Sequence, residues 1–363
     1  MNLKHALELP FETPHMVIDI DRVNANISGM QKLAGRNRKR LRPHSKTHKI
    51  PELSLLQVDR GAAGVCVQKV SEAEVMFRGG VGNLLLSNEV LGEKIRRCST
   101  LIAQGANLTV AMDNIVSVRQ FSRACENLGV EGHVMIDVNI GMDRCGVDPV
   151  NFGPLLDSIL KTPNILLDGV MAYDGHVSYP EKRKREKEVQ REEKALSRIV
   201  ERLGQKEISD PVVSVGGTPT AEMWAHTSVA NELQPGTYVY FDTHCVHLGL
   251  CTMDDIAMGV LATVTSERKG ERLVLDAGYK SVSLDQGVHP TVIDEDGNEY
   301  GVISMSEEHT VVRMPDNVSY LGKKFIMLPY HSCTTTDMWD SAYAISRGRN
   351  PREIAIEGRG KRE

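Results

Sequence analysis

The chain has 363 residues, 41% of them apolar and 25% charged, and a net charge of −5; these values are ordinary for a soluble globular protein, and the length exceeds what one hydrophobic core usually spans. The mild acidity gives no electrostatic reason to expect nucleic acid or a membrane surface as a partner, and no stretch approaches the roughly 18 apolar residues of a membrane span. Seven cysteines without CxxC spacing, and an N-terminus without a signal-peptide pattern, predict reduced thiols in the cytoplasm.

Short apolar runs alternate with longer amphipathic runs from about residue 16 to about residue 250. Strands that alternate with helices are typical of parallel βαβ units, and about eight such units favour a TIM-type (β/α)8 barrel. The longest helical run, Pro180–Leu203, is dense in charged side chains, which predicts a solvated helix face. The expected strands are Met16–Ile20, Gly64–Val67, Leu84–Leu86, Leu108–Ala111, His133–Asp137, Leu167–Met171 and Pro211–Val215.

The pattern changes after about residue 250 to short β-rich runs separated by turn residues. Asp294–Asn298 is a polar loop of the hairpin type. We therefore expect a barrel over residues 16–250 and a β domain made of residues 1–15 and 251–363. The expected β-domain strands are Ala257–Thr265, Arg272–Asp276, Gly301–Ser304, His309–Met314 and Lys324–Leu328.

A basic segment, Arg42–Lys49, is expected at the end of the second barrel strand, and active sites of such barrels gather at the C-terminal ends of strands. A Schiff-base lysine needs burial or neighbouring cations to make its neutral amine accessible, and Arg42, His44, His48 and Lys49 place positive charge near Lys46. Taken alone, the segment is also compatible with a basic surface loop.

Other segments carry weaker patterns of the same kind. Gly216, Gly217 and Thr218 follow an expected strand and precede a helical run, which suits a phosphate but also an ordinary strand-to-helix turn. Tyr173 and His176 end another expected strand and are predicted to line the pocket.

His331 and Cys333 are one residue apart, so in an extended segment they would project to the same face. An imidazole and a thiolate so placed can bind one divalent cation, with water and substrate completing the shell.

Taken together, these segments resemble a known family. Arg42–Lys49 resembles the lysine motif of the D-threonine aldolase and D-serine dehydratase family, which are fold-type III pyridoxal-phosphate (PLP) enzymes with an alanine-racemase-like barrel. Asp276–Ser281, Ser306–His309 and Leu328–Cys333 also resemble family segments, in the expected order. The resemblance implies a barrel followed by a C-terminal β domain, and a homodimer.

The resemblance assigns roles to the cofactor residues. Lys46 would carry PLP, with His44 beside it. The stretch Gly216–Thr218 would hold the cofactor phosphate. The hydroxyl of Tyr240 would complete the phosphate site, and Tyr238 is the second candidate for this role. Arg144 would lie near the phenolic oxygen of the cofactor and keep it ionised; the alternative for Arg144 is a structural salt bridge to Asp143 or Asp137.

The resemblance also implies a metal on His331 and Cys333. Aldolases of this family often carry a carboxylate at the second position, whereas the dehydratases carry cysteine. A thiolate favours zinc over manganese or magnesium, so the pair indicates the dehydratase branch. The expected activity is a PLP- and metal-dependent lyase that converts a D-3-hydroxy amino acid, such as D-serine or D-threo-3-hydroxyaspartate, to a 2-keto acid and ammonia. Retro-aldol cleavage to glycine and an aldehyde is the alternative, and a non-catalytic PLP carrier is a remote one.

Overall fold

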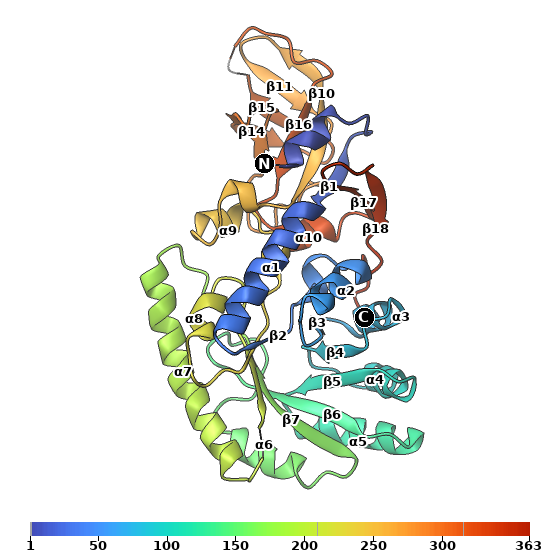
Figure 1. The fold of residues 1–363 in the computed structure, drawn as a ribbon, viewed down its shortest axis with the longest axis vertical. Helices are drawn as coiled ribbons and strands as arrows, with labels where there is room; N and C mark the ends of the chain where they lie inside the picture. Colours follow the sequence, from blue (N-terminus) through green and yellow to red (C-terminus); the bar gives the residue numbers. More distant parts are fainter. Residues whose placement is uncertain (1, 209, 315) are drawn as a thin grey trace. The chain divides into compact units, whose positions relative to one another are not determined.

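The computed structural model describes residues 2–208, 210–314 and 316–363 (Figure 1). The chain divides into two compact units. The barrel unit consists of Gly29–Lys46, Ile50–Gly236 and Lys361–Glu363, and the β-rich unit of Met1–Ser28, Thr47–Lys49 and Thr237–Gly360. Lys46 is therefore the last residue of a barrel-unit segment, and the next residue, Thr47, belongs to the β-rich unit.

Eight parallel strands form the sheet of the barrel unit, in the order β3-β4-β5-β6-β7-β8-β9-β2. A parallel bridge between His44 and Cys66, and a hydrogen bond from Ala63 N to Leu41 O (2.8 Å), join the two end strands. The predicted α/β barrel is thereby confirmed. Its strands are β2 (Arg40–Leu41), β3 (Val65–Val67), β4 (Asn83–Leu86), β5 (Asn107–Met112), β6 (Gly132–Asp137), β7 (Ile165–Ala172), β8 (Val212–Val215) and β9 (Glu232–Leu233).

In strands β3 to β7, alternate residues belong to two different cores, as the period of two in a strand requires. Val65 and Val67 pack in the large core that also includes the helices, whereas Cys66 between them belongs to a small cluster with Leu85, Ala111, Met135 and Met171. The helices are α1 (Ile20–Arg36), α2 (Pro51–Asp59), α3 (Val70–Arg78), α4 (Glu93–Ala103), α5 (Ile115–Leu128), α6 (Phe152–Ile159), α7 (Lys182–Gly204) and α8 (Ala221–Ala225). Figure 1 shows α4 and α5 outside strands β5 and β6.

The first expected strand lies in the other sheet. Strand β1 (His15–Asp19) pairs antiparallel with β10 (Met258–Arg268) and parallel with β17 (Ser341–Ile345) in the β-rich unit. The expectation that Met16–Ile20 opens the barrel is therefore wrong, and Lys46 follows the first barrel strand, β2, and not the second. A short run of buried apolar residues fits a central strand of either sheet, so the sequence did not distinguish them.

The β-rich unit contains a sheet of ten strands with mixed directions. The predicted hairpin loop Asp294–Asn298 connects two of these strands, and Gly297 N donates to Asp294 O at 3.1 Å. No helix in the described part of the chain is both long and apolar enough to span a membrane. The remaining strands are β11 (Arg272–Leu275), β12 (Thr291–Ile293), β13 (Glu299–Tyr300), β14 (Val302–Met305), β15 (Thr310–Arg313), β16 (Lys324–Leu328) and β18 (Arg352–Ala355), with helices α9 (Thr243–His247) and α10 (Ser332–Thr336).

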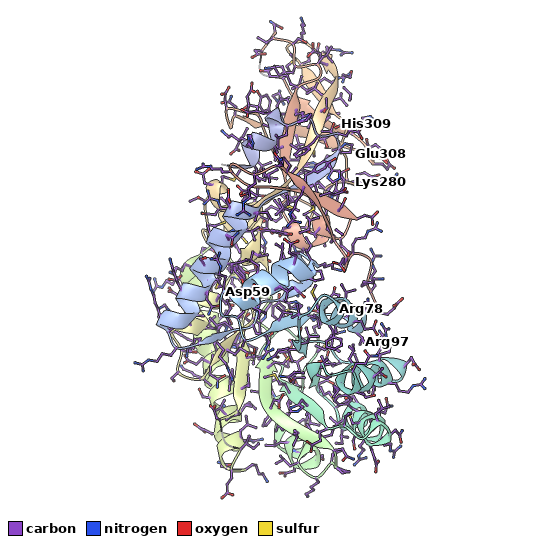
Figure 2. All side chains as sticks on the ribbon, turned by 45° about the vertical axis from the view of Figure 1, so that its right-hand side comes forward. Asp59, Arg78, Arg97, Lys280, Glu308 and His309 are labelled. Carbon is purple, nitrogen blue, oxygen red and sulfur yellow. The ribbon has the colours of Figure 1, made fainter. Side chains whose placement is uncertain are left out.

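Two of the segments that carry the family resemblance lie against each other in this unit. Tyr279 N donates to Ser306 O and Lys280 N to Glu307 O, at 2.9 and 3.1 Å. Figure 2 shows Lys280, Glu308 and His309 grouped on the β-rich unit, and an ion pair of 2.8 Å joins the first two. A Cβ atom at Gly278 would come within 2.1 Å of Ser306 O, so this backbone approach requires glycine.

Candidate active site

Lys46 lies just beyond the carboxyl end of β2, in the short 3-10 helix η2 (Ser45–Thr47). The turn is fixed to the neighbouring strand, because Ser45 Oγ donates to Cys66 O at 2.9 Å. Lys46 lines a cavity whose other walls include Asp137, Arg144, Tyr173 and Gln234. The structure thus places Lys46 at the end of the barrel where strand carboxyl ends converge.

His44 also lines this cavity and is buried. Its Nε2 lies 3.2 Å from Gln68 Oε1 and 3.1 Å from Ser87 Oγ, which come from the segments following β3 and β4. Three neighbouring strands therefore fix the ring. Sequence reasoning had not assigned a role to Gln68 or Ser87.

The ring of Tyr173 is shared by two cations. Lys46 Nζ lies 5.3 Å from the ring centroid and Arg144 Cζ lies 5.4 Å from it, both within cation–π range. A Cβ atom on Gly217 would lie 3.4 Å from the same ring. Tyr173 thus connects the lysine, the arginine and the glycine loop that were singled out in the sequence.

The other charges of the basic segment are already paired. Arg42 Nε lies 2.9 Å from Oε1 of the fully buried Glu232, and Lys49 Nζ lies 2.8 Å from Asp337 Oδ1. These two cations therefore serve ion pairs within their own units. That they place positive charge near Lys46 stays a prediction.

A carboxyl pair lines the Lys46 cavity and was missed in the sequence. Burial and a hydrogen bond with the Glu89 side chain raise the pKa of Asp137 to about 8, while Arg144 opposes this rise. Two adjacent carboxyl groups cannot both ionise easily in a buried site. No motif marks this pair, because Glu89 follows β4 whereas Asp137 is the last residue of β6.

The glycine loop follows β8. Gly216 has φ 82°, and a Cβ atom there would meet Trp224 Cδ1 at 2.8 Å, so only glycine fits. Trp224 is held in turn by a 2.7 Å hydrogen bond from Nε1 to Asp174 Oδ2. Gly217, beside Tyr173, donates from its backbone N to Thr220 Oγ1 at 3.2 Å within the turn, and the nearby Thr218 is buried. These features suit a cofactor phosphate.

His176 does not line the Lys46 cavity. Its Nε2 lies 3.1 Å from Oε1 of Glu192 on α7, and the Glu192 side chain is 1% exposed. Burial, followed by the charge of Asp174, raises the pKa of Glu192 to about 9. The structure therefore separates His176 from the residues with which it had been grouped.

Tyr240 lies in the β-rich unit and is fully buried. Its hydroxyl has no hydrogen-bond partner among the described residues. Burial, together with the neighbouring Cys333, raises its pKa well above the usual value. A buried tyrosine hydroxyl without a partner costs free energy unless a ligand satisfies it, which fits a bound cofactor.

His331 and Cys333 lie at the start of α10 and not in an extended segment, contrary to the expectation. His331 has extended backbone angles (φ −133°, ψ 108°), and the helix begins at Ser332. The side chains still meet, since the imidazole hydrogen-bonds the Cys333 sulfur. Asp242 fixes this helix start, accepting hydrogen bonds from Ser332 N and Oγ at 3.0 and 3.1 Å.

Hydroxyl and carboxylate groups surround this pair. Cys333 Sγ lies 3.3 Å from Thr47 Oγ1 and 3.8 Å from Thr237 Oγ1. His331 Nδ1 lies 2.6 Å from Asp285 Oδ2. Burial lowers the pKa of His331, but Cys333 and Asp285 outweigh it and raise that pKa to about 10. Asp285 lies 46 residues before His331 in the chain, and no local pattern in the sequence indicates their contact.

The donor set fits a divalent metal. A thiolate and an imidazole in contact are ligands that zinc prefers, and a carboxylate on the second imidazole nitrogen is the usual support of a metal-bound histidine. Among the described residues no group of three or more His, Cys, Asp and Glu side chains is arranged to hold a metal. The pair would therefore leave positions of the metal to water or substrate.

Comparison with known proteins agrees with the barrel and with the β-rich second domain. Residues 18–244 match the model of the alanine racemase N-terminal domain, and residues 257–345 match that of a putative serine dehydratase domain. These matches define a barrel enzyme of the alanine-racemase type with a dehydratase-type second domain.

Relatives of known activity resemble nearly the whole chain. The D-threonine aldolase of Arthrobacter sp is 33% identical over 346 residues, covering 93% of this chain and 90% of that protein. The D-threo-3-hydroxyaspartate dehydratase of Delftia sp. (strain HT23) is 29% identical over 365 residues, covering 93% and 95%. The chain belongs to the D-threonine aldolase and D-serine dehydratase family of fold-type III PLP enzymes, and it is a PLP-dependent lyase.

Solved structures agree with this assignment. The D-threonine aldolase of Filomicrobium marinum superposes with a TM-score of 0.88 at 30% identity, covering 96% of both chains. The Delftia dehydratase superposes with a TM-score of 0.88 at 26% identity, covering 96% and 98%. Variants of that dehydratase have a histidine or a cysteine, two positions apart, changed to alanine, and the cysteine variant is in a metal-free form.

Proposed function

We propose that this lyase eliminates water from a D-3-hydroxy amino acid and so releases a 2-keto acid and ammonia. The observation that carries the proposal is the contact of His331 with Cys333. The spacing of these residues equals that of the histidine and cysteine changed in the Delftia dehydratase variants, one of which is metal-free.

In this proposal Lys46 carries PLP, and His44, Arg144, Tyr173, Gly216, Gly217, Thr218 and Tyr240 hold the cofactor. Bound PLP supplies an electron sink for the carbanion at Cα, and the protein decides which bond breaks. The cation–π contacts of Lys46 and Arg144 with Tyr173 support a common site. Lys46 or a neighbouring base is expected to take the Cα proton. His176, which contacts Glu192 outside the Lys46 cavity, would act only indirectly.

His331 and Cys333 hold the metal in this proposal. A thiolate donor favours zinc, with manganese or magnesium as the harder alternatives. A divalent ion supplies Lewis acidity to a leaving hydroxyl. Loss of the Cα proton and the β-hydroxide gives an enamine, and water hydrolyses the enamine to the keto acid and ammonia.

Retro-aldol cleavage is the second candidate, because the aldolase of Arthrobacter sp is 33% identical to this chain. The two reactions are distinguished by product analysis. Incubation with D-serine, D-threonine and D-threo-3-hydroxyaspartate should yield a keto acid and equimolar ammonia, and the L-enantiomers should give neither. Glycine with an aldehyde would replace the dehydratase proposal with the aldolase.

A further inference from the structure

His331 has two ring nitrogens, and only one of them can serve a metal. Nδ1 lies 2.6 Å from Asp285 Oδ2. A carboxylate can only accept a hydrogen bond when ionised, so Nδ1 carries the proton. Nε2 is then the nitrogen at which a metal can bind in place of a proton.

Asp285 is itself held in place by two hydroxyl groups. Its other oxygen, Oδ1, accepts from Ser283 Oγ at 2.9 Å and from Thr334 Oγ1 at 3.0 Å. Asp285 N also donates to Ser283 Oγ at 3.2 Å. These contacts from Ser283 and Thr334 fix the position of the carboxylate that faces His331.

This arrangement assigns Asp285 to a supporting role and not to the metal itself. Both carboxylate oxygens are already engaged, Oδ2 by the imidazole and Oδ1 by two hydroxyls. The side chains of Asp285 and His331 are 31% and 28% exposed, so their contact is only partly shielded from water. A partly exposed imidazole without this partner could rotate or change tautomer.

We propose that Asp285 is the positioning residue that fixes the orientation and tautomer of His331, so that Nε2 faces the metal beside Cys333. The inference rests on the metal site of the proposed function. A carboxylate on the distal nitrogen also increases the basicity of the imidazole and thereby strengthens its bond to the metal. Asp285 thus sets how tightly the metal binds, without touching it.

The test measures zinc affinity by competition with a chromophoric chelator, using the full chain with PLP bound. Asp285→Asn preserves the shape but removes the charge, and should weaken zinc binding by about 10- to 100-fold. Thr334→Val removes one donor to Asp285 and should weaken it less, by roughly two- to tenfold. Asp294→Asn is the matched control: this carboxylate of the same unit also accepts several hydrogen bonds but contacts neither His331 nor Cys333, and its variant should bind zinc as the unmodified protein does.

A second readout separates positioning from loss of fold. Saturating cobalt should give each variant a visible spectrum, and the spectrum of Asp285→Asn should be shifted because the imidazole is no longer held, while thermal unfolding of the metal-free proteins stays similar. If the unmodified protein binds zinc and Asp285→Asn binds it equally tightly with the same cobalt spectrum, the role of Asp285 is refuted and the metal site stands. If neither the unmodified protein nor Asp294→Asn binds zinc, the metal site and the role of Asp285 both fail.

Discussion

Thr47 Oγ1 lies 3.3 Å from Cys333 Sγ, although 286 residues separate the two in the chain. Thr47 directly follows Lys46, so the residue next to the proposed cofactor lysine contacts the thiol of the proposed metal pair. Hydrogen bonds to a ligand sulfur tune the metal it binds. Of these two adjacent residues, one is therefore the proposed cofactor lysine and the other contacts a proposed metal ligand.

Removal of the metal should stop elimination but leave the cofactor in place. Hydroxide is a poor leaving group, so keto-acid formation from a D-3-hydroxy amino acid depends on a Lewis acid. Exhaustive chelation, or Cys333→Ala, should abolish keto-acid formation while the visible absorbance of bound PLP persists. Cys333→Asp should restore activity preferentially with manganese or magnesium, because a hard donor replaces a soft one.

The matched control for this cysteine is Cys251→Ala, which changes another partly buried free thiol of the same unit. Its metal content and activity should match those of the unmodified chain. Full activity after chelation, with no metal detected, would show that the pair His331 and Cys333 holds no essential ion.

Lys46 should be the residue that borohydride labels. Reduction of the PLP-bound protein should fix the cofactor on one peptide, and Lys46→Ala should lose the visible absorbance. Lys280→Ala is the control, because Lys280 is an exposed lysine that pairs with Glu308. Peptide mapping decides the matter, and label on Lys49 or Lys280 would refute the assignment.

The fold and the order of the candidate site segments could be predicted, because both follow from the period and the spacing of the apolar runs in the sequence. The buried runs at β3 to β8 alternate with helices in the way that a parallel barrel requires. Lys46, Tyr173 and the Gly216 loop follow strand ends, so the barrel topology brings them to one end. The family motifs added the chemistry that spacing alone could not supply.

Long-range pairing could not be predicted in the same way. The partners of Arg42 and His331 are Glu232 and Asp285, and nothing local in the sequence indicates either pair. The helix α1 begins at Ile20, and Asp19 caps it by accepting a hydrogen bond from Arg22 N on Oδ1. Strand β1 lies in the β-rich sheet. Its position could not be predicted, because its apolar pattern fits either core.

Tyr240→Phe should weaken cofactor retention without harming the fold. The hydroxyl is buried and has no partner among the described residues, so its removal leaves no protein hydrogen bond unmade. Loss of one charge-assisted hydrogen bond to the cofactor phosphate costs roughly 1.5–3 kcal/mol, or about ten- to a hundredfold in PLP affinity. Titration of the PLP-free protein with PLP measures this. Tyr300→Phe, which removes a hydroxyl bonded to Asp294 at 2.9 Å, is the control and should retain PLP normally. Equal affinity in both variants would assign Tyr240 a structural role.

The buried Glu192 should make the stability of the barrel unit fall as pH rises. Its pKa is raised to about 9 by burial and by Asp174, whereas an unfolded glutamate has a pKa of about 4.3. Between these values the folded chain holds one proton that the unfolded chain has lost, so the free energy of unfolding decreases with increasing pH, by at most about 1.4 kcal/mol per pH unit. Glu192→Gln cannot lose a proton and should remove this slope.

Urea unfolding at about pH 5, 7 and 9 tests this, because these values span the titration range. The two tryptophans allow the unfolding of the two units to be followed separately. Trp224 lies in the barrel unit and Trp339 in the β-rich unit, so a Trp339→Phe background reports the barrel alone. In that background the advantage of Glu192→Gln over the parent should grow with pH. Glu188→Gln changes a more exposed glutamate one turn away on α7, 33% exposed and paired with Arg191. Its charge is a smaller cause of the raised pKa of Glu192 than burial or Asp174, so most of the slope should remain. Parallel pH profiles for the parent and Glu192→Gln would mean that Glu192 ionises in the folded protein as readily as in the unfolded one.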